Sequence, residues 1–332
     1  ISGGGGGGAS SINDLSDAHA DNSSNLALGS QALQQFGTGS FTGLSNVAVG
    51  NAALYSNTSG GYNSAFGADS LRYNTSGASN CALGYYALYS CTEGNDNVAI
   101  GANALKDATT ASYNVAVGKN ALRAHGTGSR NTAIGYQSLY NTTANGNTGV
   151  GYESLKDNTT GYENTAVGDS ALAENTEGYQ NVALGYAAAF NNTTGDYNVA
   201  IGADALKDNE TGRSNIAIGY GALENLTNIS DCISIGTLAG RGANTGTTSQ
   251  WFLAIGSGSL EDQTTANYNL GVGHQTLNKA TTGGYNLAIG ANSMFELTTG
   301  TNNTGVGYNA LYNASGSSNR NTALGYKSGY SV

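Results

Sequence analysis

The chain has 332 residues, of which 51 are Gly, none is Pro and only 10% are charged. Low charge combined with regularly spaced apolar residues argues against disorder. A net charge of −10 and twelve scattered basic residues exclude a nucleic-acid-binding patch, which needs clustered Lys and Arg. No apolar run approaches the ~18 residues of a membrane span, so we expect no membrane insertion. Three cysteines are too few for a disulfide framework.

Residues 1–24 form a Gly-rich segment that we expect to be a flexible lead-in. Its run of six glycines lacks the strand-and-helix context of a phosphate loop. His19 lies close in sequence to Asp14, Asp17 and Asp21, which fits either a cation site or an ordinary polar lead-in. We favour the polar lead-in and expect no metal and no cofactor.

From residue 25 to 332 one phrase recurs eighteen times, namely Asn, apolar, Ala, apolar, Gly. Thirteen of the seventeen intervals between its glycines are 17 residues, and the others are 21, 16, 20 and 18. So regular a period predicts a solenoid in which each coil stacks on its neighbours. With each repeat counted from its glycine as position zero, these glycines are Gly29, Gly50, Gly67, Gly84, Gly101, Gly118, Gly135, Gly151, Gly168, Gly185, Gly202, Gly219, Gly236, Gly256, Gly273, Gly290, Gly307 and Gly325.

Positions −4 to zero of each repeat predict a β-strand. Position −1 is apolar in all eighteen repeats and position −2 is Ala in fourteen, so one face is bulky and the other small. We expect the bulky face to pack on position +4, which is Leu in fourteen repeats, within a second, shorter strand. The small Ala face should meet a close neighbour. A turn of the type Asn-Thr-Thr-Gly joins the two strands, and its Gly supplies a positive φ angle.

Position −4 is Asn in sixteen of the eighteen repeats. Coils stacked about 4.8 Å apart would bring these side chains into a ladder of buried amides. An exposed turn Asn with a left-handed backbone is the alternative, and the ladder is favoured. In the middle of the array the predicted ladder residues are Asn97, Asn114, Asn131, Asn147, Asn164, Asn181, Asn198 and Asn215.

These patterns predict an all-β fold, a parallel β-roll or β-helix solenoid of about 18 coils covering residues 25–332. A helical fold is disfavoured because Gly and β-branched residues recur too densely.

One repeat, between Gly236 and Gly256, is irregular, because it has 20 residues and contains Trp251, the only tryptophan. The ladder position holds Cys232 in the repeat that ends at Gly236 and Phe252 in the next one. Two explanations compete. Phe252 fills the space left by the missing amides and Trp251 covers the joint, or the loop at 242–250 is a recognition feature with Trp251 as its aromatic anchor. Packing is favoured.

Tyrosine is the strongest binding signal, since seven of 21 tyrosines occupy position +1. Exposed tyrosine rings beside Asn amides suit glycans, because the rings stack on C–H faces and the amides bond hydroxyls. The alternative is that the rings only cover the edge of the roll. The candidate binding tyrosines are Tyr136, Tyr152, Tyr186 and Tyr220.

Paired carboxylates would be needed for polysaccharide cleavage. Asp157 and Glu174 fall in adjacent coils, which could place them near the ~5–5.5 Å spacing of a retaining glycosidase. However, both belong to a polar turn, where no apolar surroundings would raise one pKa into the range of a general acid. We therefore expect a solvated rim and no enzyme, and a depolymerase remains an alternative function.

The repeat resembles those of phage and virus tail-fibre-like proteins and is similar to the β-roll heads of trimeric autotransporter adhesins. The likeness rests on stretches such as Asn131-Thr-Ala-Ile-Gly-Tyr136 and Asn181-Val-Ala-Leu-Gly-Tyr186. It implies a left-handed roll and a homotrimer around one axis, with the small Ala faces meeting. It also implies a structural fibre or adhesin shaft on a virion or in the extracellular space, attached to a cell-surface glycan or receptor. A glycan-binding shaft using its Tyr and Asn rows is a second interpretation.

Overall fold

The computed structural model describes residues 18–20, 24–35, 41–242, 251–314 and 317–331. The chain divides into two compact units, Ile1–Val150 and Gly151–Val332. Both are built from the same coil of about 17 residues with one three-residue strand, and the described residues contain no helix. The predicted all-β parallel solenoid is therefore confirmed. In the described ranges no helix is long and apolar enough to cross a membrane.

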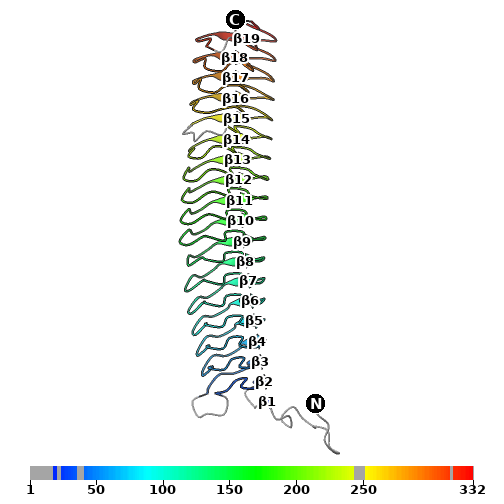
Figure 1. The fold of residues 1–332 in the computed structure, drawn as a ribbon, viewed down its shortest axis with the longest axis vertical. Coiled ribbons are helices and arrows are strands. Elements are labelled where there is room, and N and C mark those ends of the chain that lie inside the picture. The colour runs from blue at the N-terminus through cyan, green and yellow to red at the C-terminus, as the bar shows by residue number, and fades with distance from the viewer. Residues whose placement is uncertain (1–17, 21–23, 36–40, 243–250, 315–316, 332) are drawn as a thin grey trace, which may run out of the picture. The chain divides into compact units, whose positions relative to one another are not determined.

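In the first unit, strands β2 to β9 stack in parallel at matched positions, so that Ala99 of one strand lies beside Ala116 of the next. The first strand differs, because β1 pairs antiparallel with β2. Figure 1 shows these strands following one another along the unit. Their bounds are β1 Ala18–Ala20, β2 Leu26–Leu28, β3 Val47–Val49, β4 Ser64–Phe66, β5 Cys81–Leu83, β6 Val98–Ile100, β7 Val115–Val117, β8 Thr132–Ile134 and β9 Thr148–Val150.

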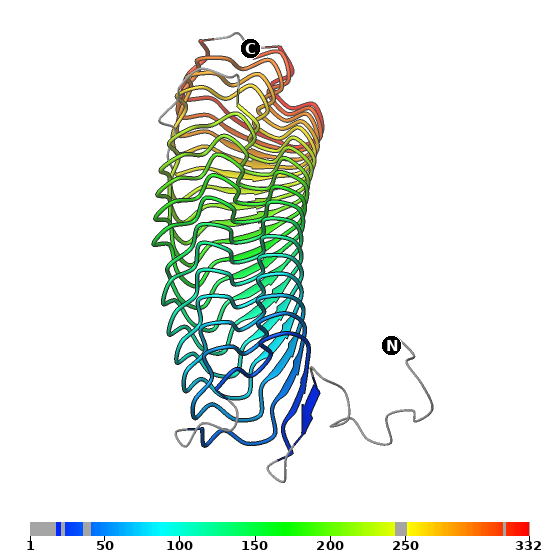
Figure 2. The same cartoon turned by 60° about the horizontal axis from the view of Figure 1, so that its bottom comes forward.

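In the second unit the parallel stack continues unbroken through the irregular repeat, where Ile233 pairs with Leu253. Figure 2 shows the strands forming one wall of the coils, while the turns close the other sides. The bounds are β10 Thr165–Val167, β11 Val182–Leu184, β12 Val199–Ile201, β13 Ile216–Ile218, β14 Ile233–Ile235, β15 Leu253–Ile255, β16 Leu270–Val272, β17 Leu287–Ile289, β18 Thr304–Val306 and β19 Thr322–Leu324.

The small side chains of the strands point into the coil, and the bulky ones point out. Ala99 and Ala116 at position −2 are completely buried, whereas the flanking residues of β6 and β7 are half-buried or exposed. Leu105 and Leu122 at position +4 fill the interior. The predicted packing of the bulky face on Leu was therefore wrong. An interior filled by one Leu per coil leaves room only for Ala on the facing strand.

The predicted second strand is also wrong, because the Leu at position +4 lies in a turn. Leu105 has a φ of 50°, and its N–H donates to the carbonyl of Ala121 in the next coil at 3.0 Å. A left-handed backbone costs an L-residue roughly 1–2 kcal/mol. The hydrogen bond between coils and the complete burial of the Leu side chain hold the turn in this conformation.

Glycine in the Asn-Thr-Thr-Gly type of turn is required by close packing rather than by a positive φ. Gly60 is not in the left-handed region, but a Cβ on it would lie 2.2 Å from the carbonyl oxygen of Gly77 in the next coil. The phrase-ending glycine needs both features, since Gly118 has a φ of 135° and its Cβ would lie 2.4 Å from the oxygen of Gly135. The predicted reason for the turn glycine was therefore wrong.

The asparagines at position −4, which we call the ladder column, are buried and bonded from coil to coil. Nδ2 of Asn97 donates to Oδ1 of Asn80 at 3.0 Å and to the carbonyl of Ala111 at 2.8 Å. Oδ1 of Asn97 in turn accepts the backbone N–H of Asn114 at 3.0 Å. The same burial applies to all eight residues predicted for the ladder: Asn97, Asn114, Asn131 and Asn147 in the first unit, and Asn164, Asn181, Asn198 and Asn215 in the second.

Candidate interaction surface

The outward side chains at positions −3 and −1 form an apolar strip along the strands of each unit, which we call the strand face. Leu184 at position −1 is 47% exposed, and Ile134 and Ile289 are exposed to a similar degree. None of the residues at these two positions is charged in any of the eighteen repeats. Because the strands stack at matched positions, the exposed side chains form continuous columns rather than scattered spots.

Position +1, just after the strand glycine, forms one border of the strand face, which we call the trailing border. The four tyrosines predicted to bind glycans lie here. All four rings are exposed, Tyr136 least and Tyr186 most. They do not form one continuous row, because Ala203 stands between the coils of Tyr186 and Tyr220. Elsewhere on this border Tyr308 and Tyr326 stack with their centroids 5.6 Å apart.

Position −5, two residues before the strand, forms the opposite, leading border. Sequence reasoning missed this column, although its period-two spacing from positions −3 and −1 places it on the same side of the coil. Its residues adopt positive φ angles, for example 60° at Tyr62. Six of them are aromatic and each is at least half exposed: Tyr62, Tyr113, Tyr197, Trp251, Tyr268 and Tyr285.

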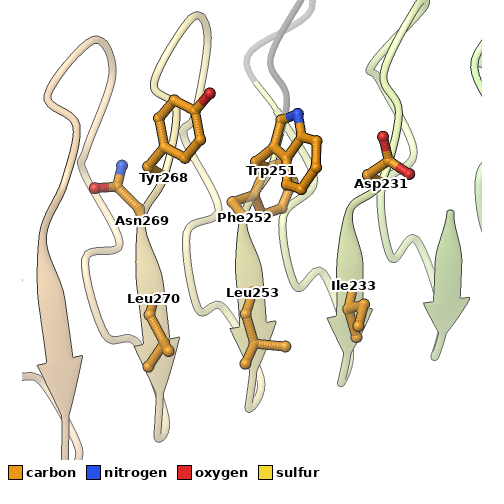
Figure 3. A pocket seen from close by; sticks show the side chains of 8 residues that line it. All are labelled: Asp231, Ile233, Trp251, Phe252, Leu253, Tyr268, Asn269 and Leu270. Carbon is orange, nitrogen blue, oxygen red and sulfur yellow. The ribbon is translucent and has the colours of Figure 1, made fainter.

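Three of these aromatic residues form a row in successive coils of the second unit. Trp251 and Tyr268 stack with centroids 6.4 Å apart, and Tyr268 and Tyr285 with centroids 4.9 Å apart. Figure 3 shows Trp251 between Tyr268 and Asp231 at one end of the strands. An open hollow of about 330 Å³ lies here between the leading border and the strand face. Its lining comprises Asp231, Ile233, Trp251, Phe252, Leu253, Tyr268, Asn269 and Leu270.

The two residues predicted to act together at the irregular repeat have different environments. Trp251 is exposed, whereas Phe252 is 4% exposed and occupies the ladder position inside the coil. The sulfur of Cys232 stands in place of an Asn oxygen, and it accepts from the backbone N–H groups of Phe252 and Trp251. It also donates to the carbonyl of Ser230 at 3.3 Å. Phe252 therefore serves packing. Of the loop at 242–250 in the recognition hypothesis, residues 243–250 lie outside the described residues.

The candidate chemical groups lie in different environments, and only Asp157 and Glu174 occupy equivalent turns of adjacent coils. Asp157 is half-buried and Glu174 exposed on the outer turns. His274 lies at the surface, and the side chain of His19 with its neighbouring aspartates lies outside the described residues. His125, by contrast, is completely buried. Within the part of the chain that is described, no group of three His, Cys, Asp or Glu side chains is placed to hold a metal ion.

Comparison with protein-family models, curated proteins and solved structures found no match to this chain.

Proposed function

We propose that the chain is a non-enzymatic structural fibre, the shaft or head of an adhesin, in which three copies pack their strand faces together around one axis. Its place is a virion surface or the extracellular space, and its partner there is a cell-surface glycan or receptor. The observation that carries this proposal is the exposed, charge-free strand face.

The strand face repeats along the whole stack of strands in each unit instead of forming an isolated spot. Monomeric proteins rarely present contiguous apolar patches beyond a few hundred Å². Here exposed side chains such as Ile100 and Ile134 in the first unit, and Leu184 and Ile235 in the second, recur along whole stacks of strands. A second copy of the chain is the occupant that fits, because it presents the same strip with the same spacing between coils. Other apolar partners would have to match that spacing.

The distribution of charge supports the same occupant. The chain carries a net charge of −10, which would keep copies apart if acidic residues lay on the contact. Positions −3 and −1 contain none of them. The resemblance to trimeric fibre repeats supports three copies. However, the contact surface is not the predicted Ala face, because those alanines are enclosed within each coil.

Light scattering or analytical ultracentrifugation of the chain tests this proposal, and we expect a mass near three chains. Leu184→Glu places a carboxylate on the strand face of every copy. Juxtaposed like charges at an interface cost several kcal/mol, so association should weaken about 100-fold or more.

Thr194→Glu is the matched control, because Thr194 lies exposed on a turn of the same coil, away from the strand face. It adds the same charge and should leave the mass unchanged. Circular dichroism should show both variants folded. A monomeric parent chain, or equal effects of the two substitutions, would contradict the proposal.

A further inference from the structure

The two borders of the strand face carry aromatic residues in a mutually exclusive pattern. Six repeats have an aromatic residue at position −5 and seven have Tyr at position +1, but no repeat has both. Independent placement over eighteen repeats would be expected to give about two repeats with both. In the coil of Tyr197 the other border holds Ala203, whereas in the coil of Tyr220 it holds Ser214. A large residue on one border is thus matched by a small or polar residue on the other.

Contact within one chain does not account for this pattern. Positions −5 and +1 are six residues apart, and the outward side chains at −3 and −1 lie between them. At about 3.3 Å per extended residue the two borders are on the order of 15–20 Å apart. Positions that vary together among homologues indicate spatial contact, and we apply the same reasoning to the repeats of this array. The contact that couples them must therefore lie between copies of the chain.

Only one kind of packing brings the two borders of the same repeat together. When copies run parallel, with their coils at the same height around a common axis, the −5 border of each copy meets the +1 border of the next. An antiparallel pair would instead bring −5 against −5 from different repeats. We propose that the fibre is a parallel, in-register, closed assembly in which these two borders interlock, with at most one of the two border positions of a repeat occupied by Tyr or Trp. This inference rests on the self-association proposed above.

Charged residues on the borders support the same pairing. All three Lys and Arg residues at these positions share a repeat with an aromatic residue on the other border. Between copies, each would meet an aromatic ring as a cation–π partner. These pairs are Tyr113 with Lys119, Arg130 with Tyr136, and Arg320 with Tyr326.

Acidic residues on the borders follow the opposite rule. Asp96, Glu163, Asp169 and Asp231 all fall in repeats without a border aromatic. A carboxylate would meet an unfavourable negative ring face, so its exclusion from aromatic repeats is expected. One pair, Glu163 with Asp169, would bring two carboxylates together. Within the chain Glu163 accepts a hydrogen bond from Gln180 at 2.8 Å, which offsets part of that repulsion.

This pairing assigns the tyrosines of the two borders and Trp251 to assembly instead of glycan binding. The row of Trp251 and Tyr268 would face Ser257 and His274 of the next copy. The hollow beside Asp231 lies where the aromatic row ends, in a repeat whose other border is Thr237. Neither border residue of that repeat fills the space.

A double-mutant cycle in one repeat tests the proposal. Ser214→Tyr adds a second ring opposite Tyr220 and should weaken association at least tenfold. Tyr220→Ala removes the existing ring and should also weaken it. The double variant moves the ring from one border to the other and should regain association to within a few-fold of the parent. Ser214 and Tyr220 are exposed in the single chain, so circular dichroism should show every variant folded.

Disulfide trapping tests the register, in a chain whose Cys81 is replaced by Ser. Asp96→Cys with Ala102→Cys puts one thiol on each border of one repeat, too far apart to join within a chain. Oxidation should link three chains covalently. Asp96→Cys with Tyr136→Cys, two coils apart, should not link them.

The outcomes separate the two proposals. A trimeric mass with additive effects in the cycle and no crosslinking of the same-repeat pair would overturn the interlocked borders and leave the fibre proposal standing. A monomeric parent chain would overturn both.

Discussion

Two buried columns of side chains run through the coils, and they differ in how much variation they accept. The ladder column at position −4 is Asn in sixteen of eighteen repeats. The column at position +7, which we call the inner-turn column, is equally buried, yet it holds Asn192 in one coil, Leu226 in another and, in the first unit, Cys91 and His125. Burial alone therefore does not determine the residue type.

The difference lies in what each amide bonds. In the ladder column, Oδ1 of Asn181 accepts the backbone N–H of Asn198 at 2.9 Å, and its Nδ2 donates to the carbonyl of Gly195 at 2.8 Å. In the inner-turn column, Nδ2 of Asn192 donates to the same carbonyl at 3.0 Å and to Oδ1 of Asn175 at 2.8 Å. The carbonyl thus has two donors and can lose one. In the ladder column, the backbone N–H of the next coil depends on a single side-chain oxygen. Leaving that buried N–H unpaired is costly, and this keeps Asn at position −4.

The largest expected effect comes from breaking the ladder column. Asn181→Leu keeps the size of the side chain but removes the acceptor for the N–H of Asn198. A buried donor left unpaired costs about 1–3 kcal/mol. We expect the free energy of unfolding, measured by denaturant titration at fixed protein concentration, to fall by about that amount.

The matched control is Asn192→Leu in the inner-turn column of the same region. The carbonyl of Gly195 would keep its bond from Asn181, and only Oδ1 of Asn175 would lose its donor, as Oδ1 of Asn209 already does beside Leu226. We therefore expect a loss of about 1 kcal/mol, smaller than at Asn181. The chain already contains this replacement at Leu226, where the carbonyl of Ile229 accepts from Asn215 at 2.7 Å. Equal losses for the two Leu variants would show that the dependent backbone N–H is not what distinguishes the columns.

A smaller change, a gain in the free energy of unfolding, is expected from restoring Asn at the ladder position that holds Cys232. At Cys232 a sulfur stands in for the Asn oxygen, and burial raises the pKa of the thiol to about 12, so it stays protonated at neutral pH. A thiol sulfur is a weak acceptor. Cys232→Asn should therefore strengthen the bond from the N–H of Phe252 and raise the free energy of unfolding by about 0.5–1.5 kcal/mol. A loss of stability would mean that the packing around Phe252 does not accommodate an amide.

Repetition made the solenoid and the ladder asparagines predictable, but not the direction in which the strand faces. Ala at −2 and Ile or Val at −1 alternate equally well whichever side is inside. The deciding residue is the Leu at +4, such as Leu105, whose bulk fills the interior and leaves room only for Ala99 opposite. Hydrophobicity by itself favoured burying the larger face. The prediction that the Ala face meets a neighbouring chain was therefore wrong, because those alanines are enclosed within each coil.

The asparagines of the inner-turn column were predicted to lie in a turn, but their burial was not recognised. Its asparagines do bond the carbonyl three residues on, as Asn158 does to Gly161 at 2.8 Å. Yet the same position holds Leu226 and Leu297, and a large apolar residue seldom recurs at an exposed turn position. That substitution pattern was the available signal of burial. The close packing that requires the turn glycines was missed for a different reason. It arises between neighbouring coils, and a single repeat does not show which atoms of the next coil lie against it.

The smallest expected effect is the pH response of the inner-turn column at His125. Both ring nitrogens face carbonyl oxygens, with Nδ1 2.9 Å from Thr142 and Nε2 2.6 Å from Gly128. Nε2 also lies 3.4 Å from the amide nitrogen of Asn131. Burial nevertheless lowers the pKa of His125 below its ordinary value of 6.5, because loss of solvation outweighs the two carbonyls.

A lowered pKa in the folded chain means that the unfolded chain binds the extra proton first. The stability contributed by neutral His125 is therefore complete above about pH 6.5 and is lost as the pH falls towards the lower folded value. His125→Asn, which restores the commonest polar residue of this column, removes that dependence. As the pH falls from about 7.5 to about 5.5, the parent should lose stability relative to the variant. The loss in unfolding free energy should be at most ~1.4 kcal/mol per pH unit. If the parent instead gained stability relative to the variant as the pH falls, the two carbonyls would be holding a charged imidazolium. Hydrogen bonding, and not burial, would then determine the protonation of His125.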